Sequence, residues 1–228
     1  MSALKAIASN IWYRSHHFVA SGIPVSSRMT VIRLKDGRLW LHSPVPLSVS
    51  ERKELESLGQ VGYIVAPNRM HHLFLAEYAS AYPDALLFGA PGLRAKRPDL
   101  TRLSELGPTV EASWKDDLEQ VFFDGIPIGN ETVWFHIASR TLILTDLCQW
   151  WQGELPFAAK AYAHVTGVRR QLAVPRTIRL MVRDRHAARA SAQEILQWPF
   201  ERVVMAHNAI VEDGAYPEVK RAFTVFGC

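Results

Sequence analysis

The stretch IVAPNRMHHLFLAEY at residues 64–78 joins two kinds of local structure. It begins inside the apolar run QVGYIVAP (residues 60–67), whose short length and β-branched content predict a buried strand. Apolar side chains then return at helical spacing, so we expect a helix over residues 71–82. A second short apolar run, ALLFGAP at residues 85–91, predicts another strand. This strand–helix–strand unit favours a mixed sheet covered by helices.

Upstream of this unit, the chain predicts a hairpin followed by a short helix. In RMTVIRLKDGRLWLHSP (residues 28–44), the Asp-Gly pair at the centre is a strong signal for a tight turn between two strands. The run at residues 48–59 predicts a helix, with Ser48 or Ser50 as its N-cap and Gly59 at its end. The first third of the chain is therefore expected to consist mainly of strands.

The second half of the chain predicts further strands and a helical region. A strand pair is expected at residues 132–138 and 141–147, and mainly helices over residues 155–198, broken near Gly167 and Pro175. The run FERVVMAHN predicts a last strand, and YPEVKRAFTVF a last helix. No linker rich in Gly, Ser or Pro divides the chain, so residues 1–228 are expected to form a single domain.

The composition is ordinary for a globular chain of 228 residues, with 48% hydrophobic and 21% charged residues. The net charge is +4, and basic residues gather in residues 160–189. We interpret this region as a solvated helical face, with attraction of phosphate or an acidic partner as the alternative. Since no aromatic residues interleave with the basic run at residues 167–189, nucleic-acid binding is not expected.

Cysteine usage and hydropathy indicate the compartment. The two cysteines, Cys148 and Cys228, form no CxxC motif, and the N-terminus lacks the long apolar segment of a signal peptide. We therefore expect a cytoplasmic protein with reduced thiols. No apolar run approaches the roughly 18 residues of a membrane-spanning helix, so no membrane association is expected. The sequence leaves the oligomeric state open, with a homodimer as one expectation.

Three predicted strands end in side chains that can bind metal. His71 and His72 follow the strand that ends at Asn68, Asp146 follows TLILT, and His207 follows RVVMA. In a sheet of this type, ligands bind in the crevice beyond the strand ends. Imidazole nitrogen and carboxylate oxygen suit Zn²⁺, Fe²⁺ or Mn²⁺. Each strand end alone is a weak signal, because such residues also cap turns, but their coincidence indicates a site.

The order and contexts of these segments resemble the metallo-β-lactamase superfamily over residues 29–223. The resemblance implies an α/β fold, a four-layer αββα sandwich with metal in a groove at one edge of its two sheets. APNRMHHLF lies where the superfamily carries its His-x-His-x-Asp-His signature, RTLILTDL resembles the strand ending in its metal-bridging Asp, and VVMAHN the strand ending in its last ligand histidine. The altered pattern resembles a divergent bacterial branch of the superfamily.

Carried over residue by residue, the resemblance implies a degenerate signature. Asn68 and Met70 stand where the first two histidines belong, His71 takes the place of the Asp, and His72 that of the final histidine. Met70 is a soft, weak ligand and is expected to fill core instead. The superfamily's separate histidine has no clear equivalent, and Glu131 is the candidate oxygen ligand in that region.

The resemblance therefore implies one metal position instead of two. The expected ligands are His72, Asp146 and His207, with His71 and Glu131 as helpers. Three protein ligands and an open position are typical of a catalytic mononuclear site. The sequence leaves open whether His71 or His72 faces the groove, because adjacent residues point in different directions.

These features predict a metal-dependent hydrolase with one divalent cation, zinc first, and iron or manganese as alternatives. Asp146 and His71 are the expected catalytic residues, and Asn68, Asn208 and Trp150 are expected to contact a small-molecule substrate of possibly anionic character. Two alternatives remain open at this point. One is a metal- or ligand-binding protein without turnover, and the other is an interaction module that kept the fold.

Overall fold

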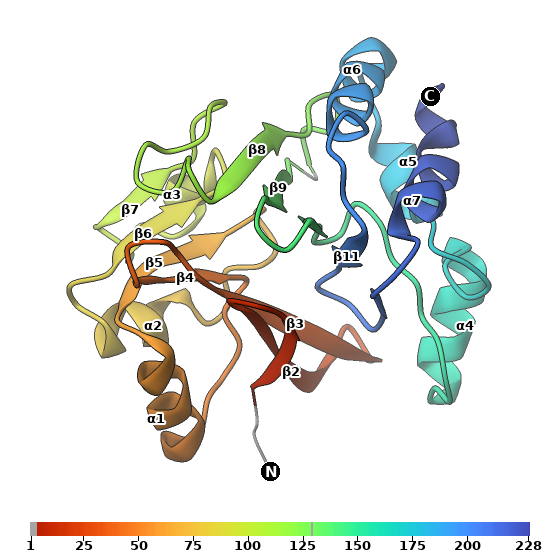
Figure 1. Cartoon of the computed structure of the whole chain (residues 1–228). Coiled ribbons are helices and arrows are strands. Elements are labelled where there is room, and N and C mark those ends of the chain that lie inside the picture. Colours follow the sequence, from red (N-terminus) through yellow and green to blue (C-terminus); the bar gives the residue numbers. More distant parts are fainter. Residues whose placement is uncertain (1–3, 129) are drawn as a thin grey trace.

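The computed structural model describes residues 4–128 and 130–228, and its strands form two sheets that lie face to face (Figure 1). The larger sheet has seven strands, paired in chain order: β1 (Lys5–Ala8), β2 (Ile11–Ala20), β3 (Ile23–Arg33), β4 (Leu39–His42), β5 (Val61–Ala66), β6 (Leu86–Gly89) and β7 (Leu103–Glu105). The smaller has the order β12 (Ile210–Val211), β11 (Arg202–Val204), β10 (Thr141–Ile143), β9 (Thr132–His136) and β8 (Leu118–Phe122).

Helices cover the outer faces of both sheets, which gives the four-layer αββα sandwich that the family resemblance implied (Figure 1). Beside the larger sheet lie α1 (Val49–Leu58), α2 (Leu75–Ala81) and the short α3 (Leu93–Lys96). Beside the smaller lie α5 (Arg176–Met181), α6 (Arg185–Ile195), α7 (Ala215–Phe223) and a 3₁₀ turn at Thr224–Phe226. The helix α4 (Phe157–Thr166) packs against α5 and against strand β3 of the larger sheet. None of the helices in the described part of the chain is long and apolar enough to span a membrane.

The alternation of side chains along the strands builds a separate core on each face of the larger sheet. On β4, Leu39 and Leu41 point toward α1 and α2, whereas Trp40 between them points toward the smaller sheet. The core between the two sheets is rich in aromatic side chains, which include Trp40, Tyr63, Trp114 and Trp134. Since strands buried on both faces read as continuous apolar runs, this arrangement explains the unbroken runs in the sequence.

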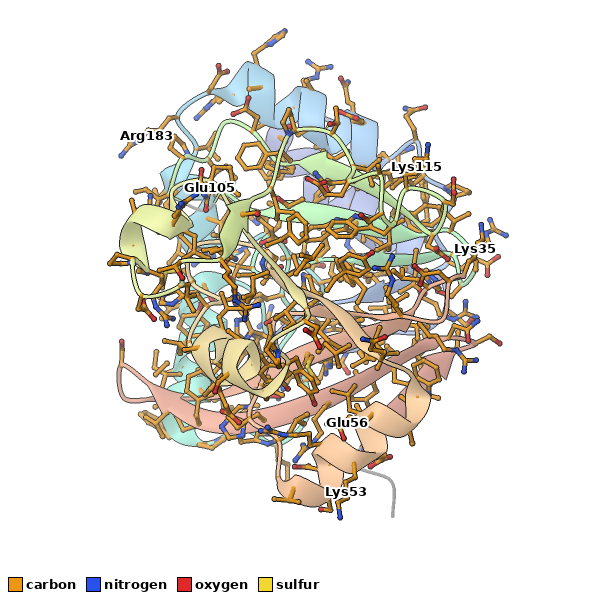
Figure 2. The ribbon with its side chains drawn as sticks, turned by 90° about the vertical axis from the view of Figure 1, so that its left-hand side faces the viewer. Lys35, Lys53, Glu56, Glu105, Lys115 and Arg183 are labelled. Atoms are coloured by element: carbon orange, nitrogen blue, oxygen red, sulfur yellow. The ribbon has the colours of Figure 1, made fainter. Side chains whose placement is uncertain are left out.

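The predicted hairpin and first helix are confirmed. Strands β3 and β4 pair antiparallel around the KDG turn, and Asp117 joins this turn to the smaller sheet by accepting the Lys35 backbone N–H at 3.2 Å. Figure 2 shows Lys35 and Lys115 on the same side of the molecule, which agrees with this link between the sheets. Ser48 is the N-cap of α1, in a capping box with Glu51, so the first of the two predicted caps is correct.

The helix predicted over residues 71–82 begins later than expected. Residues 71–74 form turns, and α2 starts only at Leu75. The cause is Asn68, whose side-chain oxygen accepts the backbone N–H groups of Met70 and His71 at 2.9 and 3.0 Å. Such side-chain bonds give the backbone an alternative to helix, and they hold residues 68–71 in a fixed turn.

The helical region at residues 155–198 divides at the predicted breaks. Gly167 ends α4 in the left-handed conformation with φ 84°, and Pro175 precedes the first residue of α5. A third helix, α6, begins at the N-cap Asp184, whose side chain accepts the N–H groups of His186 and Ala187. The region is therefore three short helices, of which α5 and α6 pack beside the smaller sheet and α4 packs against α5 and strand β3 (Figure 1).

Candidate metal centre

Three side chains from distant segments meet at one edge of the sandwich. His71 follows β5, Asp146 follows β10 and His207 follows β11, and one potential ligand atom from each lies within 4.8 Å of the other two. His207 Nε2 is 2.9 Å from Asp146 Oδ1, and His71 Nε2 is 3.3 Å from Asp146 Oδ2. Because β10 and β11 are parallel neighbours, Asp146 and His207 emerge at the same edge of their sheet.

Hydrogen bonds fix the orientation of both imidazoles. His207 Nδ1 donates to the carbonyl oxygen of Ser26 at 2.9 Å, which places a proton on Nδ1 and turns Nε2 toward Asp146. His71 Nδ1 shares a 2.6 Å hydrogen bond with the hydroxyl of Ser43, and its Nε2 also faces Asp146. Metal-binding histidines are commonly held in this way, with the outer nitrogen bonded to a carbonyl or another polar group.

Electrostatics keep Asp146 ionised although its side chain is largely shielded from solvent. Burial by itself raises the pKa of Asp146, but the charges and hydrogen bonds of His71 and His207 outweigh it and hold the pKa well below its usual value. For His207, burial lowers the pKa, and the hydrogen bond and charge of Asp146 outweigh this effect and raise it. The carboxylate is thus negatively charged near neutral pH and lies between two imidazoles.

Asn68 stabilises the centre from the turn that follows β5. It is 1% exposed, and its Nδ2 donates to Asp146 Oδ2 at 2.7 Å. Its oxygen accepts the N–H group of His71 at 3.0 Å, so one side chain positions both the carboxylate and the histidine. The sequence suggested that Asn68 contacts substrate, and its side chain also lines the cavity described below.

His72, expected as a ligand, lies outside this group. Its Nδ1 is 3.2 Å from Arg97 Nη1, and its carbonyl oxygen accepts from the same guanidinium at 2.9 Å. Burial and the neighbouring cations Lys96 and Arg97 lower the pKa of His72. The turn made by Asn68 sets which of the adjacent histidines faces the groove, and it is His71.

Glu131, the other expected ligand, lies outside the group of three and accepts hydrogen bonds from the backbone. It is buried, and its two oxygens accept three successive backbone N–H groups, those of Thr145, Asp146 and Leu147, at 2.6, 2.7 and 2.9 Å. Burial and the Asp146 carboxylate raise the pKa of Glu131, and the three backbone donors oppose this shift. Glu131 therefore holds the segment that presents Asp146, because both of its oxygens are already engaged.

Two expected substrate contacts also differ in the structure. Trp150 packs against the core of the smaller sheet, and the neighbouring Trp151 lines the cavity, since adjacent residues in an extended segment point to opposite sides. Asn208 points into its own loop, where Oδ1 accepts the N–H of Gln152 at 2.8 Å. The carbonyl of Asn208 accepts from Arg28, a buried side chain that the sequence reading missed.

Arg28 organises the loop that carries His207. Its guanidinium donates to the carbonyl oxygens of Met205, Asn208 and Ala209, two of them through the same nitrogen. Burial lowers the pKa of Arg28 to about 10. The sequence signal for Arg28 was a charged residue in the interior of the mostly uncharged strand β3. The signal for Ser43 was a hydroxyl side chain directly after strand β4.

A cavity of about 490 Å³ adjoins the centre, and Asp146, His71 and His207 all line it. Met70, expected to fill core, is 63% exposed and lies at this cavity. Its position follows from the turn at Asn68, which directs the side chain outward from the protein core.

The family model described as "Domain of unknown function (DUF4336)" matches residues 9–173. The chain belongs to the DUF4336 family. Among curated proteins, no relative matches it. Similar solved structures include a metallo-β-lactamase from Pontibacter korlensis, 14% identical with a TM-score of 0.64, where 98% of each chain is covered.

Two further structures are similar to this DUF4336 chain. A metallo-β-lactamase from Erythrobacter litoralis is 10% identical with a TM-score of 0.65, covering 98% of this chain and 95% of that one. A flavodiiron core from Synechocystis sp. is 12% identical with a TM-score of 0.67, covering 98% of this chain and 60% of that one. The DUF4336 chain thus has the fold of the metallo-β-lactamase superfamily, as the sequence resemblance implied.

The donor set of this DUF4336 chain fits a divalent cation. Two imidazole nitrogens and one carboxylate oxygen are a ligand set found for zinc in hydrolases and for iron in oxygenases. His71 and His207 have their outer nitrogens fixed, and Asp146 supplies one negative charge. Within residues 4–128 and 130–228, no second group of three such side chains is found.

Proposed function

We propose that this protein is a metal-dependent hydrolase in which His71, Asp146 and His207 hold a single divalent cation, with zinc as the first candidate. The observation that carries the proposal is the convergence of these side chains within 4.8 Å at the edge of a metallo-β-lactamase fold. Proteins named metallo-β-lactamases are among the structures of the same fold, which supports hydrolysis as the reaction class.

A divalent cation bound there would lower the pKa of a coordinated water to about 7 and polarise the bond to be cleaved. The chain's own residues prepare this chemistry. Ser26 keeps His207 Nε2 turned inward, and Asn68 holds Asp146 in place. Asp146 stays ionised near neutral pH, so it acts as a ligand and charge partner in this proposal and not as a proton donor.

His71 is proposed as a ligand whose ring is oriented by Ser43. Its Nε2 faces the carboxylate, and its Nδ1 is bonded to the hydroxyl of Ser43, which can both donate and accept a proton. With Nε2 bound to the cation, its lone pair would not be free to take up a proton, so the hydrogen bond from Nδ1 to Ser43 serves to orient the imidazole. The mononuclear character follows from Asn68 and Met70, which replace donors that a second cation needs.

Metal content tests the first half of the proposal. The protein is purified without added metal, loaded separately with Zn²⁺, Fe²⁺ or Mn²⁺, and measured by elemental analysis. We expect close to one cation per chain, lost in His71→Ala and His207→Ala and kept in the matched control His72→Ala. Loss of binding in His72→Ala with retention in His71→Ala would contradict the site, as would the absence of binding for all three metals.

A hydrolase panel tests the second half. Esters, lactones, thioesters and phosphodiesters are assayed with the metal-loaded protein, with chelator-treated protein and with His71→Ala as controls. We expect hydrolysis of at least one class that disappears in both controls. One bound cation without any hydrolysis across the panel would refute the enzyme and establish a metal-binding protein without turnover.

A further inference from the structure

The cavity beside the metal centre has the size of a small-molecule site. Its volume is about 490 Å³, within the range of roughly 300–1,000 Å³ that is typical of ligand pockets. His71, Asp146 and His207 line it together, so a molecule that occupies the cavity lies beside the proposed cation. The composition of the remaining wall therefore bears on the kind of molecule that the site accepts.

Apolar side chains from separate segments make up most of this wall. They come from the β2–β3 hairpin, the turns before α2, the loop between β8 and β9, the segment after β10, and α5. Examples from these five segments are Phe18, Val25, Phe74, Ile126, Trp151 and Met181. Apolar surface that converges from five segments on one cavity forms a continuous lining, which favours an apolar ligand by the hydrophobic effect.

The wall offers no cationic partner for a charged ligand. Among the described residues that line the cavity, none is Lys or Arg, and the carboxylates present are Asp146 and Glu131. An anionic group placed away from the metal centre would be desolvated without a counter-charge, which is costly in an apolar setting. A substrate whose distal part is anionic is therefore disfavoured, in contrast to the anionic character considered from the sequence.

The mouth of the cavity is apolar as well. Met70, Leu73 and Ile128 line it and are 63%, 58% and 56% exposed. Large apolar side chains that cluster at an opening and face solvent indicate a surface that a ligand covers on binding. This exposure is an observation independent of the cavity wall, and it points to the same ligand chemistry.

We propose that the substrate is an uncharged molecule with an extended apolar part, such as an ester or lactone carrying an alkyl chain. The hydrolysable group lies at His71, Asp146 and His207, and the apolar part fills the cavity between the β2–β3 hairpin and α5. This inference rests on the proposed hydrolase function for the reacting group, whereas the recognition of the apolar part is separately measurable.

Binding without turnover is measured with N-phenyl-1-naphthylamine, an uncharged fluorescent probe, on metal-free and zinc-loaded protein. The probe is displaced by methyl alkanoates of four to twelve carbons, and by analogues whose chain ends in a carboxylate. We expect affinity to rise roughly fourfold for each added methylene, the factor equivalent to ~0.8 kcal/mol per buried CH₂. The carboxylate-ended analogues should bind at least about tenfold more weakly.

Variants that add a positive charge to the cavity wall test the same inference in a second way. Met181→Lys introduces a cation into the lining, and Thr177→Lys does so at an exposed position of the same wall in case the first variant fails to fold. Both should weaken binding of methyl-ended chains and strengthen that of carboxylate-ended chains. The matched control is Leu180→Lys, on the same helix but 79% exposed and outside the lining, and it should leave both affinities within about twofold.

The outcomes separate this inference from the proposed function. Failure of the probe to bind, or equal binding of methyl-ended and carboxylate-ended chains by the unmutated protein, would overturn the inference. Metal-dependent hydrolysis with a kcat/KM independent of chain length would overturn it too, and would leave the hydrolase intact. Chain-length-dependent binding together with an absence of metal uptake would refute the hydrolase and support the apolar cavity as a ligand site.

Discussion

Replacing Glu131 by Gln tests whether this residue supports the Asp146 segment or binds metal. The carboxylate accepts the backbone N–H of Thr145 through one oxygen, and those of Asp146 and Leu147 through the other. Glutamine keeps the shape but retains a single acceptor oxygen, and its NH₂ group only donates. If that oxygen serves Asp146 and Leu147, the N–H of Thr145 faces a donor and loses its partner.

The expected loss of stability follows from this one N–H group that is left without an acceptor. A buried N–H without an acceptor costs about 1–3 kcal/mol of stability. For a chain of this length, each kcal/mol lowers Tm by about 2–4 °C, so a loss near the middle of the range gives roughly 4–8 °C. Glu131 accepts the backbone N–H of Asp146, so the change should also weaken metal binding by about 10- to 100-fold, as expected for a residue that positions a ligand.

Urea unfolding of the metal-free protein, monitored by tryptophan fluorescence, measures the free energy of unfolding without any contribution from a cation. Glu119→Gln on β8 is the matched control, because it removes the same carboxylate at an exposed position of the same sheet and should change stability by less than about 0.5 kcal/mol. Unfolding of metal-free Glu131→Gln within about 0.5 kcal/mol of the unmutated protein, combined with complete loss of metal, would refute the supporting role and restore Glu131 as a ligand.

Three further predictions concern the backbone, acid stability and the His207 loop. Gly125→Ala should lose more than about 2 kcal/mol in urea unfolding, since a Cβ there lies 2.2 Å from a backbone oxygen, whereas Gly153→Ala, with open space around it, should lose about 1 kcal/mol. Burial lowers the pKa of His136 to about 4. As the pH falls, the unfolded chain therefore takes up a proton on this histidine before the folded chain does. Between pH 7 and 5 this difference should lower the free energy of unfolding by about 2 kcal/mol, and His136→Asn should lack this contribution. Arg28→Lys replaces a forked donor with a point charge; chelator competition should show weaker metal binding, and unchanged affinity would contradict its positioning role.

Local signals in the sequence determined most of the secondary structure. The KDG turn, the Ser48 cap, the break at Gly167 and the short apolar runs each depend on residues close together in the chain, and the structure contains all of them. The strand ends after β5, β10 and β11 were also readable, because a change from apolar to polar residues marks the end of a buried strand. Asp146 and His207 were identified in this way.

Tertiary structure decided which side chains share the site. The choice of His71 over His72 depends on a turn made by the Asn68 side chain, and the choice of Trp151 over Trp150 depends on the direction of an extended segment. The hydrogen bonds of Glu131 were not readable from the sequence, because its three partners lie 14 to 16 residues away. The apolar cavity is assembled from five segments, none of which forms a pocket alone. The local sequence pattern indicates whether a residue is buried or polar. The direction of its side chain and its hydrogen-bond partners depend on contacts between distant segments, which only the folded chain brings together.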